Sequence, residues 1–101
     1  MGSESSTSHE PGGRLTHRFH ARDLHLVVAP PAPGTTVRFR VQLDGRAPGT
    51  DHGLDVDSTG HGTVTEPRLY QLLRRRGRIT GGTFEVEFLD PGGAVYALTF
   101  G

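Results

Sequence analysis

Hydrophobic and polar residues alternate along most of this chain. Four segments show the alternation most clearly, and they are residues 24–28, 37–43, 84–88 and 96–100. A period of two is typical of strands that bury one side and expose the other. The four segments are therefore predicted to be half-buried antiparallel strands. The large inward side chains expected to form the core are Phe39, Phe84, Phe88 and Phe100.

Weaker strands are predicted at residues 14–20, 52–56 and 62–65. The segment RLYQLLRRR, residues 68–76, is ambiguous, because Leu69, Leu72 and Leu73 also have helical spacing. A strand is favoured here, since the surrounding segments are β and Gly77 ends the run early. The turn residues Asp-Pro-Gly-Gly at 90–93 predict a hairpin between the last two strands.

Seven or eight short strands with turn residues between them predict an all-β fold. The expected architecture is a two-layer antiparallel β-sandwich of jelly-roll or immunoglobulin-like type. Residues 14–101 would form this one domain. Residues 1–13 are rich in Ser, Gly and Glu and are predicted to be a disordered leader or linker.

Composition narrows the range of functions. Eleven arginines balance eleven acidic residues, so no overall field favours nucleic acid or an anionic membrane. The chain has no cysteine, which excludes a disulfide framework and thiolate chemistry. No membrane span or signal peptide is evident, so the chain is expected to be cytoplasmic unless it is part of an exported protein. Edge strands in so small a sandwich make a homodimer plausible.

The densest polar segment is HGLDVDSTGHGTVTE, residues 52–66. Its spacing fits most of an EF-hand calcium loop, with ligands from Asp55, Asp57, Thr59 and Glu66. No helix is expected before Asp55, and the alternative is a β-hairpin in which these residues serve turn geometry. A second metal reading takes zinc or iron ligands from His52, Asp55, Asp57 and His61, which would suit a small metal-dependent enzyme.

Tyr70 and Tyr96 are candidate ligand-binding residues, because a tyrosine ring on a sheet face can stack on a sugar or anchor a protein. The alternative places both rings in the core. The one local excess of charge is Arg74, Arg75, Arg76 and Arg78, expected to be a solvated strand end, and Arg74 is taken as a further candidate contact. No set of residues for nucleophilic catalysis is evident, so the chain is expected not to be an enzyme.

Four stretches of the sequence carry a family resemblance. They are HARDLHLVVAP, VRFRVQLDG, HGLDVDSTGHGTVTEPRLYQLLR and, most specifically, FEVEFLDPGGAVYALTFG. Together they resemble the C-terminal domain of DipZ-like, thioredoxin-family proteins of actinobacteria, from Leu15 to Gly101. In that family the domain follows a thioredoxin-like domain and is similar to jelly-roll carbohydrate-binding modules.

The resemblance implies a non-catalytic accessory module. Its expected partner is a carbohydrate or a thioredoxin-like domain. The chain itself has no Cys-x-x-Cys motif, so it cannot carry out the redox step of such proteins.

Overall fold

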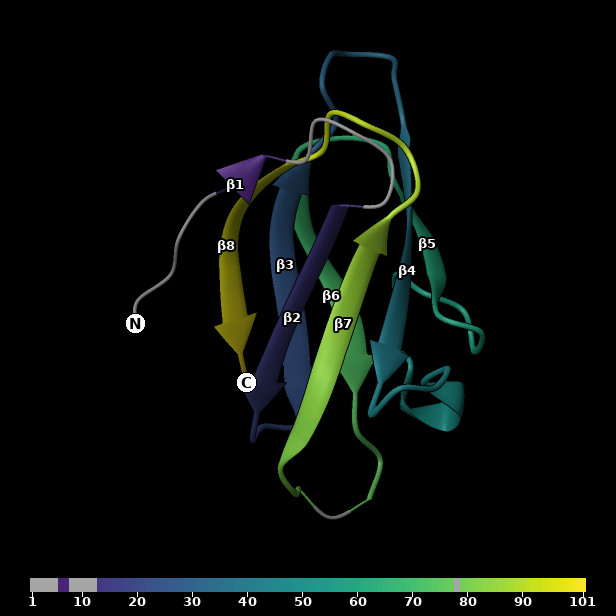
Figure 1. Cartoon of the computed structure of the whole chain (residues 1–101), viewed down its shortest axis with the longest axis vertical. Helices are drawn as coiled ribbons and strands as arrows, with labels where there is room; N and C mark the ends of the chain where they lie inside the picture. Colours follow the sequence, from purple (N-terminus) through teal and green to yellow (C-terminus); the bar gives the residue numbers. More distant parts are fainter. Residues whose placement is uncertain (1–5, 8–12, 78) are drawn as a thin grey trace.

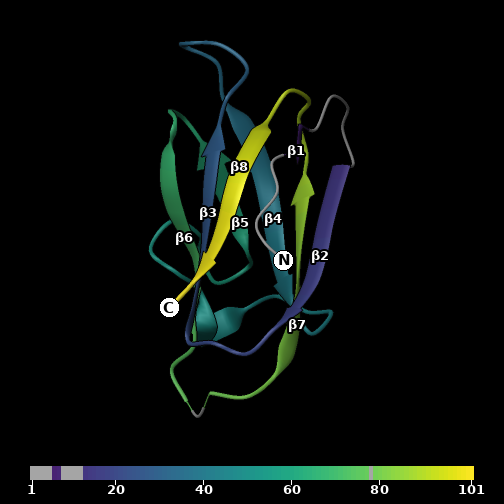
Figure 2. The ribbon, with the colours of Figure 1, turned by 90° about the vertical axis from the view of Figure 1, so that its left-hand side faces the viewer.

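Short strands run back and forth between two sheets that pack face to face (Figures 1 and 2). The computed structural model describes residues 6–7, 13–77 and 79–101. Sheet A has the strand order β1-β8-β3-β6 and sheet B the order β2-β7-β4-β5. All strand pairs are antiparallel, which confirms the predicted two-layer, jelly-roll-like sandwich. The strands are β1 (Ser6–Thr7), β2 (Gly13–Phe19), β3 (Asp23–Ala29), β4 (Val37–Leu43), β5 (His61–Val64), β6 (Arg68–Arg74), β7 (Gly82–Phe88) and β8 (Ala94–Phe100).

The core lies between the sheets and comes from the alternating positions. On β3, Leu24, Leu26 and Val28 are buried, while the residues between them are half-buried on the outer side. Phe39 and Phe84 are fully buried from the opposite sheet. Burial of one such side chain stabilises the fold by about 1.5–3 kcal/mol, so this two-residue period dominates the stability.

The ambiguous segment after residue 67 is a strand, as predicted, because β6 pairs with β3 along its length. Two of its leucines follow one another into the core. A register shift opposite Leu24 and His25 lets Leu72 and Leu73 both point inward, and both are fully buried. This bulge explains why the apolar spacing resembled that of a helix.

The predicted hairpin at residues 90–93 is wrong. The loop reverses the chain, but β7 pairs in sheet B and β8 in sheet A. Local contacts hold the loop over β4 instead: Leu89 N–H donates to the Arg38 carbonyl at 2.8 Å, and the Arg38 guanidinium binds the Asp90 carboxylate at 2.8–2.9 Å. Turn residues specify a reversal of direction, whereas the sheet that receives the next strand is decided by packing.

Phe100 is not a core residue, contrary to expectation, since 48% of its surface is exposed. Its ring stacks on Phe19 with the centroids 6.0 Å apart, at the side of the sandwich where β2 and β8 are edge strands. Tyr96 also lies outside the core, so the alternative that places its ring there is wrong. A register shift opposite Val27 and Val28 makes it an extra residue of β8, and its ring is 56% exposed.

The strand predicted at residues 52–56 is absent. A 3₁₀ helix, Gly49–Asp51, leads into turns, and only His52 forms an isolated bridge, to Leu73. The segment still lies along the outer edge of β6, because Gly53 N–H donates to the Leu72 carbonyl at 2.9 Å.

Most of the predicted leader, residues 1–13, lies outside the described residues. Its described parts are the two residues of β1, which pair with Val95 and Ala94 of β8, and Gly13, the first residue of β2. No helix in the described part is long and apolar enough to cross a membrane.

Candidate functional site

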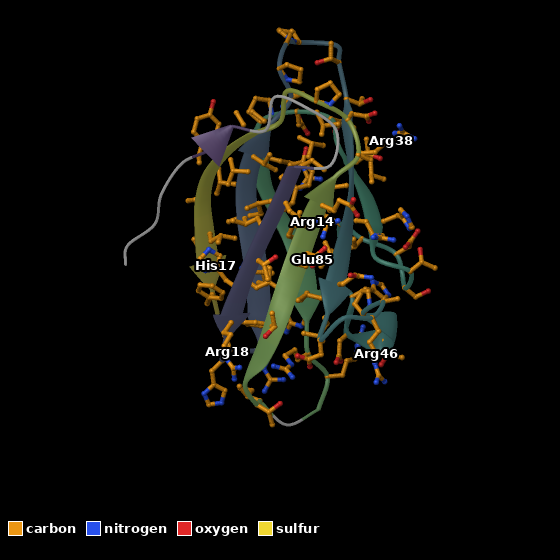
Figure 3. All side chains as sticks on the ribbon, in the orientation of Figure 1. Arg14, His17, Arg18, Arg38, Arg46 and Glu85 are labelled. Carbon is orange, nitrogen blue, oxygen red and sulfur yellow. The ribbon has the colours of Figure 1, made fainter. Side chains whose placement is uncertain are left out.

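The outer faces of the two sheets have different chemistry. The outer face of sheet B is a lattice of ion pairs (Figure 3). Arg14 lies 3.5 Å from Glu85 and 3.6 Å from Glu87, and Glu87 also binds Arg40 at 2.7 Å. Arg38, on the same strand as Arg40, pairs with Asp90 at 2.8 Å. Each carboxylate in this lattice is thus already engaged by a cation of the same face.

The outer face of sheet A carries an uncharged apolar band instead. It crosses three strands, because Val27 of β3 is paired with Ala97 of β8 on one side and with Leu69 of β6 on the other. Tyr96 lies at the β8 end of the band and Leu69, 46% exposed, at the β6 end. Adjacent strands are about 4.8 Å apart, so the band spans roughly 10 Å, which suits one or two sugar rings.

A row of polar side chains runs beside the apolar band. His25 of β3 is paired with Thr99 of β8 and with Gln71 of β6. The Gln71 Oε1 atom accepts a hydrogen bond from Leu54 N–H at 3.0 Å, and its amide NH₂ donates to no described residue. The outer face of sheet A therefore combines the apolar band with a row of hydrogen-bonding groups about 7 Å away, two residues along β3.

Arg74 lies on the same outer face, at the far end of the sheet from the apolar band. It is paired in register with Asp23, and its Nη1 atom is 3.5 Å from Asp23 Oδ2. Val27 is four positions after Asp23 on β3, a distance of about 13 Å along the strand. Tyr96 and Arg74 thus share a face but do not form one compact site.

Tyr70 is in the core and its ring is 1% exposed, which corrects its assignment as a ligand-binding residue. Its hydroxyl accepts hydrogen bonds from Thr65 N–H at 3.0 Å and Glu66 N–H at 3.2 Å. It donates to the Glu66 carbonyl at 2.7 Å. These bonds fix the crossing from β5 to β6 and form a tyrosine corner, a device of β-sandwiches.

Asp55 is occupied by structural contacts. Its Oδ1 atom accepts from Arg68 Nη2 and its Oδ2 atom from Gln71 N–H, at 2.8 and 2.7 Å. Burial acts to raise the pKa of this carboxyl, but the hydrogen bonds from Arg68 and Gln71 and nearby positive charge outweigh it, so the pKa lies below its ordinary value. The carboxylate anchors the loop to β6.

Asp57 and Thr59 form a turn. Asp57 Oδ1 accepts from the Thr59 hydroxyl at 2.6 Å, from Thr59 N–H at 2.9 Å and from His61 N–H at 3.0 Å. The Thr59 hydroxyl and the His61 backbone bond together lower the pKa of Asp57. Gly60 completes the turn at φ +93°, where a side chain would collide with the Val41 carbonyl. Asp57, Thr59 and Gly60 thus shape a turn, which is the alternative to a calcium loop.

The metal ligands expected from the sequence do not gather. Glu66 is exposed at its carboxylate and lies 3.7 Å from Arg68 Nε. His52 Nδ1 is bonded to the Gly53 carbonyl. Throughout residues 6–7, 13–77 and 79–101, no three His, Asp or Glu side chains form a group that could hold a metal ion. Calcium binding by Asp55, Asp57, Thr59 and Glu66 stays a prediction for solution measurement.

Sequence reasoning missed most of the apolar band. Alternation alone does not single out Val27 or Leu69, because it does not say which strands lie on either side of them. The one available signal was Leu-Val-Val in residues 26–28, in which an apolar residue also occupies the outer side of β3. A contiguous apolar patch indicates a binding surface, whereas one such residue does not, so this signal alone could not identify the band.

A family comparison covers the whole chain. The sequence model of the family described as thioredoxin like C-terminal domain matches residues 1–101. No curated protein matches the chain.

Solved structures similar to this chain share its fold at low identity. A family two carbohydrate esterase from Clostridium thermocellum, in complex with cellohexaose, gives a TM-score of 0.67 at 11% identity, over 94% of this chain and 26% of the esterase. The corresponding enzyme from Cellvibrio japonicus gives 0.63 at 11%, over 96% and 28%. The chain thus spans about a quarter of these esterases.

A smaller neighbour matches over most of both chains. It is the CBM36-1 domain of a multidomain xylanase from the hindgut metagenome of Trinervitermes trinervoides. The TM-score is 0.57 at 8% identity, over 97% of this chain and 84% of that domain. At such identities the likeness establishes the sandwich fold.

Proposed function

This chain belongs to the thioredoxin-like C-terminal domain family, and on that premise we propose that it is a non-catalytic accessory module that binds carbohydrate on the outer face of sheet A. The observation that carries the proposal is the apolar band with the exposed Tyr96 ring at its end. The DipZ-like, actinobacterial affiliation indicated by the sequence is part of the proposal.

The chemistry of the face fits a sugar. A pyranose ring presents C–H groups on its faces and hydroxyls around its rim. The Tyr96 ring and the Val27 and Leu69 side chains offer apolar surface to the C–H faces of the sugar. The Gln71 amide and the His25 imidazole can donate hydrogen bonds to the sugar hydroxyls and accept hydrogen bonds from them. An open face of this kind favours weak binding, with a dissociation constant of about 0.1–1 mM, or roughly 4–5.5 kcal/mol.

The accessory role is supported by what the comparisons align. The esterase matches cover 26% and 28% of those enzymes, so most of each enzyme lies outside the likeness. The carbohydrate-binding domain of the xylanase aligns over 84% of its length. The carboxylates of Asp55 and Asp57, the densest acidic residues of the chain, are engaged in loop contacts, which further supports a module without catalytic machinery.

A thioredoxin-like domain is the second candidate partner, and the family assignment favours it. The apolar band would then be a protein interface whose anchor residues are Tyr96 and Leu69. The two partners differ in what the polar row would contact, since a sugar needs hydrogen bonds from Gln71 and His25 whereas an apolar protein surface does not.

A glycan array followed by calorimetry tests the proposal. We expect binding to one class of oligosaccharide, and Tyr96→Ala should weaken it at least about tenfold, the effect of losing about 1.4 kcal/mol. Thr16→Ala, on the outer face of sheet B, is the matched control and should bind like the wild type. Pull-down by a thioredoxin-like domain without any glycan binding would support the second candidate. Binding to neither would remove both.

A further inference from the structure

The edges of the two sheets are protected to different degrees. They are formed by β2, β5 and β6 and, beyond the two residues that pair with β1, by β8. β2 carries Arg14, His17 and Arg18 at exposed positions, and charge on an edge strand disfavours pairing with another chain. β5 is only four residues long. The edge of β6 is covered by the loop that precedes β5, since Asp55 N–H donates to the Gln71 carbonyl at 3.1 Å. Three edges are therefore guarded by charge, by shortness or by cover.

Beyond Val95, β8 carries no charge and no described segment covers it, and its one irregularity is the bulge at Tyr96. β1 pairs only with Ala94 and Val95 at its start. The remaining residues, Tyr96 to Phe100, read Tyr-Ala-Leu-Thr-Phe and include neither a charge nor a proline. Within the part of the chain that the structure describes, no strand pairs with this edge. Both aromatic rings are about half exposed, at 56% and 48%. Such a strand is a template for strand addition.

The sequence of this edge is nearly symmetrical about Leu98. Aromatic, small, leucine, small and aromatic residues follow one another, so an antiparallel second copy would match the pattern of the first. Leu98 would oppose its own copy, and Ala97 would oppose Thr99 of the second molecule. Centring the pairing on Leu98 keeps Ala97, Leu98 and Thr99 in the middle of the ladder. It leaves the bulge residue Tyr96 at the end, opposite Phe100 of the second copy, and stops where β1 begins. No like charges meet, and a two-fold interface requires this self-complementarity.

We propose that the chain forms a two-fold dimer through antiparallel pairing of β8 with β8 of a second copy, centred on Leu98. The pairing joins the two A sheets into one continuous sheet. The two-fold axis is perpendicular to this sheet, so both outer faces lie on the same side, and the two apolar bands can engage one extended ligand together. The ladder is short, and its interface belongs to the small, transient class. The dimer therefore exchanges with monomer as concentration changes.

Sedimentation of the wild-type protein over a range of concentrations is the first test. We expect a reversible shift from the mass of one chain to that of two. Thr99→Lys adds two charges per dimer to the ladder and should abolish the shift. Thr16→Lys adds the same charge to the β2 edge and should leave it unchanged. These measurements need no sugar, so they are independent of carbohydrate binding.

Disulfide trapping tests the register, because the natural chain has no cysteine. Directly opposed residues have Cα atoms about 4.5–5.5 Å apart, within the range of about 4.4–6.8 Å that a disulfide spans. Leu98→Cys should therefore form a cross-linked dimer under mild oxidation. Thr99→Cys is the matched control, since its copies would lie about 8 Å apart and should not cross-link.

Sedimentation tests whether the dimer exists, and cross-linking tests its register. A wild-type protein that stays monomeric at every accessible concentration overturns the proposal, whatever the variants do. Equal cross-linking of Leu98→Cys and Thr99→Cys in a dimer overturns the register. Thermal melts of each variant establish that it is folded, and if Leu98→Cys does not fold, the wild-type and Thr99→Lys sedimentation results decide.

Discussion

The Tyr70 hydroxyl connects two successive strands that lie in different sheets. It binds three backbone groups of residues 65 and 66, at the point where the chain leaves β5 for β6. Its ring is buried and also lies under the Arg68 guanidinium, 3.8 Å from the ring centroid. The residues between β5 and β6 pair with no described strand, and the Tyr70 hydroxyl supplies hydrogen bonds to their backbone groups instead.

Removing that oxygen should destabilise the domain. Tyr70→Phe leaves two backbone N–H groups without their acceptor, so the free energy of unfolding should fall by about 1–3 kcal/mol. Denaturant unfolding measures the change. Tyr96→Phe is the matched control, because its hydroxyl is on an exposed ring, and should change the value by less than about 0.5 kcal/mol. Equal effects of the two variants would show that the corner contributes nothing.

Asp90 makes stability depend on acid pH. The side-chain hydrogen bond from Arg38, followed by the Arg38 backbone N–H, lowers the pKa of Asp90 from 3.8 to about 2. Because the folded pKa lies below the unfolded one, this contribution is complete above about pH 4 and is lost as the pH falls through 2. Melting temperatures between these values should decline less steeply in Asp90→Asn than in the wild type. Parallel pH profiles would contradict this assignment.

Hydrogen bonds within the chain organise the loop that precedes β5. Its two aspartates each bind backbone N–H groups, and Gly60 at φ +93° turns the chain. Because the charges of Asp55 and Asp57 are already compensated by such bonds, we expect millimolar calcium to leave the melting temperature unchanged. A rise in the midpoint that is lost in Asp57→Asn would instead show that the loop rearranges around calcium.

The alternation of apolar and polar residues predicts the major strands correctly. Each of these strands buries one face, so every second residue is apolar. Strand β4 is the clearest case, with each predicted inward residue buried. Alternation could not predict the two bulges, at Leu72 and Tyr96, because each adds one residue without changing the local chemistry. It also could not predict that β7 and β8 belong to different sheets, since this depends on contacts between distant residues such as Arg38 and Asp90.

The candidate site was only partly predictable for the same reason. The chemistry of Tyr96 makes it a candidate binding residue, but its neighbours in space come from β3 and β6. Val27 and Leu69 join it only once the register of sheet A is known. Tyr70, identical in chemistry, is in the core. The difference between the two tyrosines is set by packing of the whole sandwich.

At the scale of the molecule, the sandwich separates two surfaces. Sheet B presents ion pairs that satisfy one another, and sheet A presents an apolar band without compensating charge. An accessory module needs one face that can be desolvated at little cost, and uncharged side chains meet that condition. This difference between the two faces is why the proposal places binding on sheet A.

Backbone amide NMR during titration with the oligosaccharide selected by the array tests this assignment most directly. We predict that the shifts concentrate at Val27, Leu69, Gln71, Tyr96 and Ala97, and that the amides of β2 and β7 stay unchanged. Shifts confined to sheet B or to the loop of residues 52–60, with the amides around Tyr96 unaffected, would contradict the account.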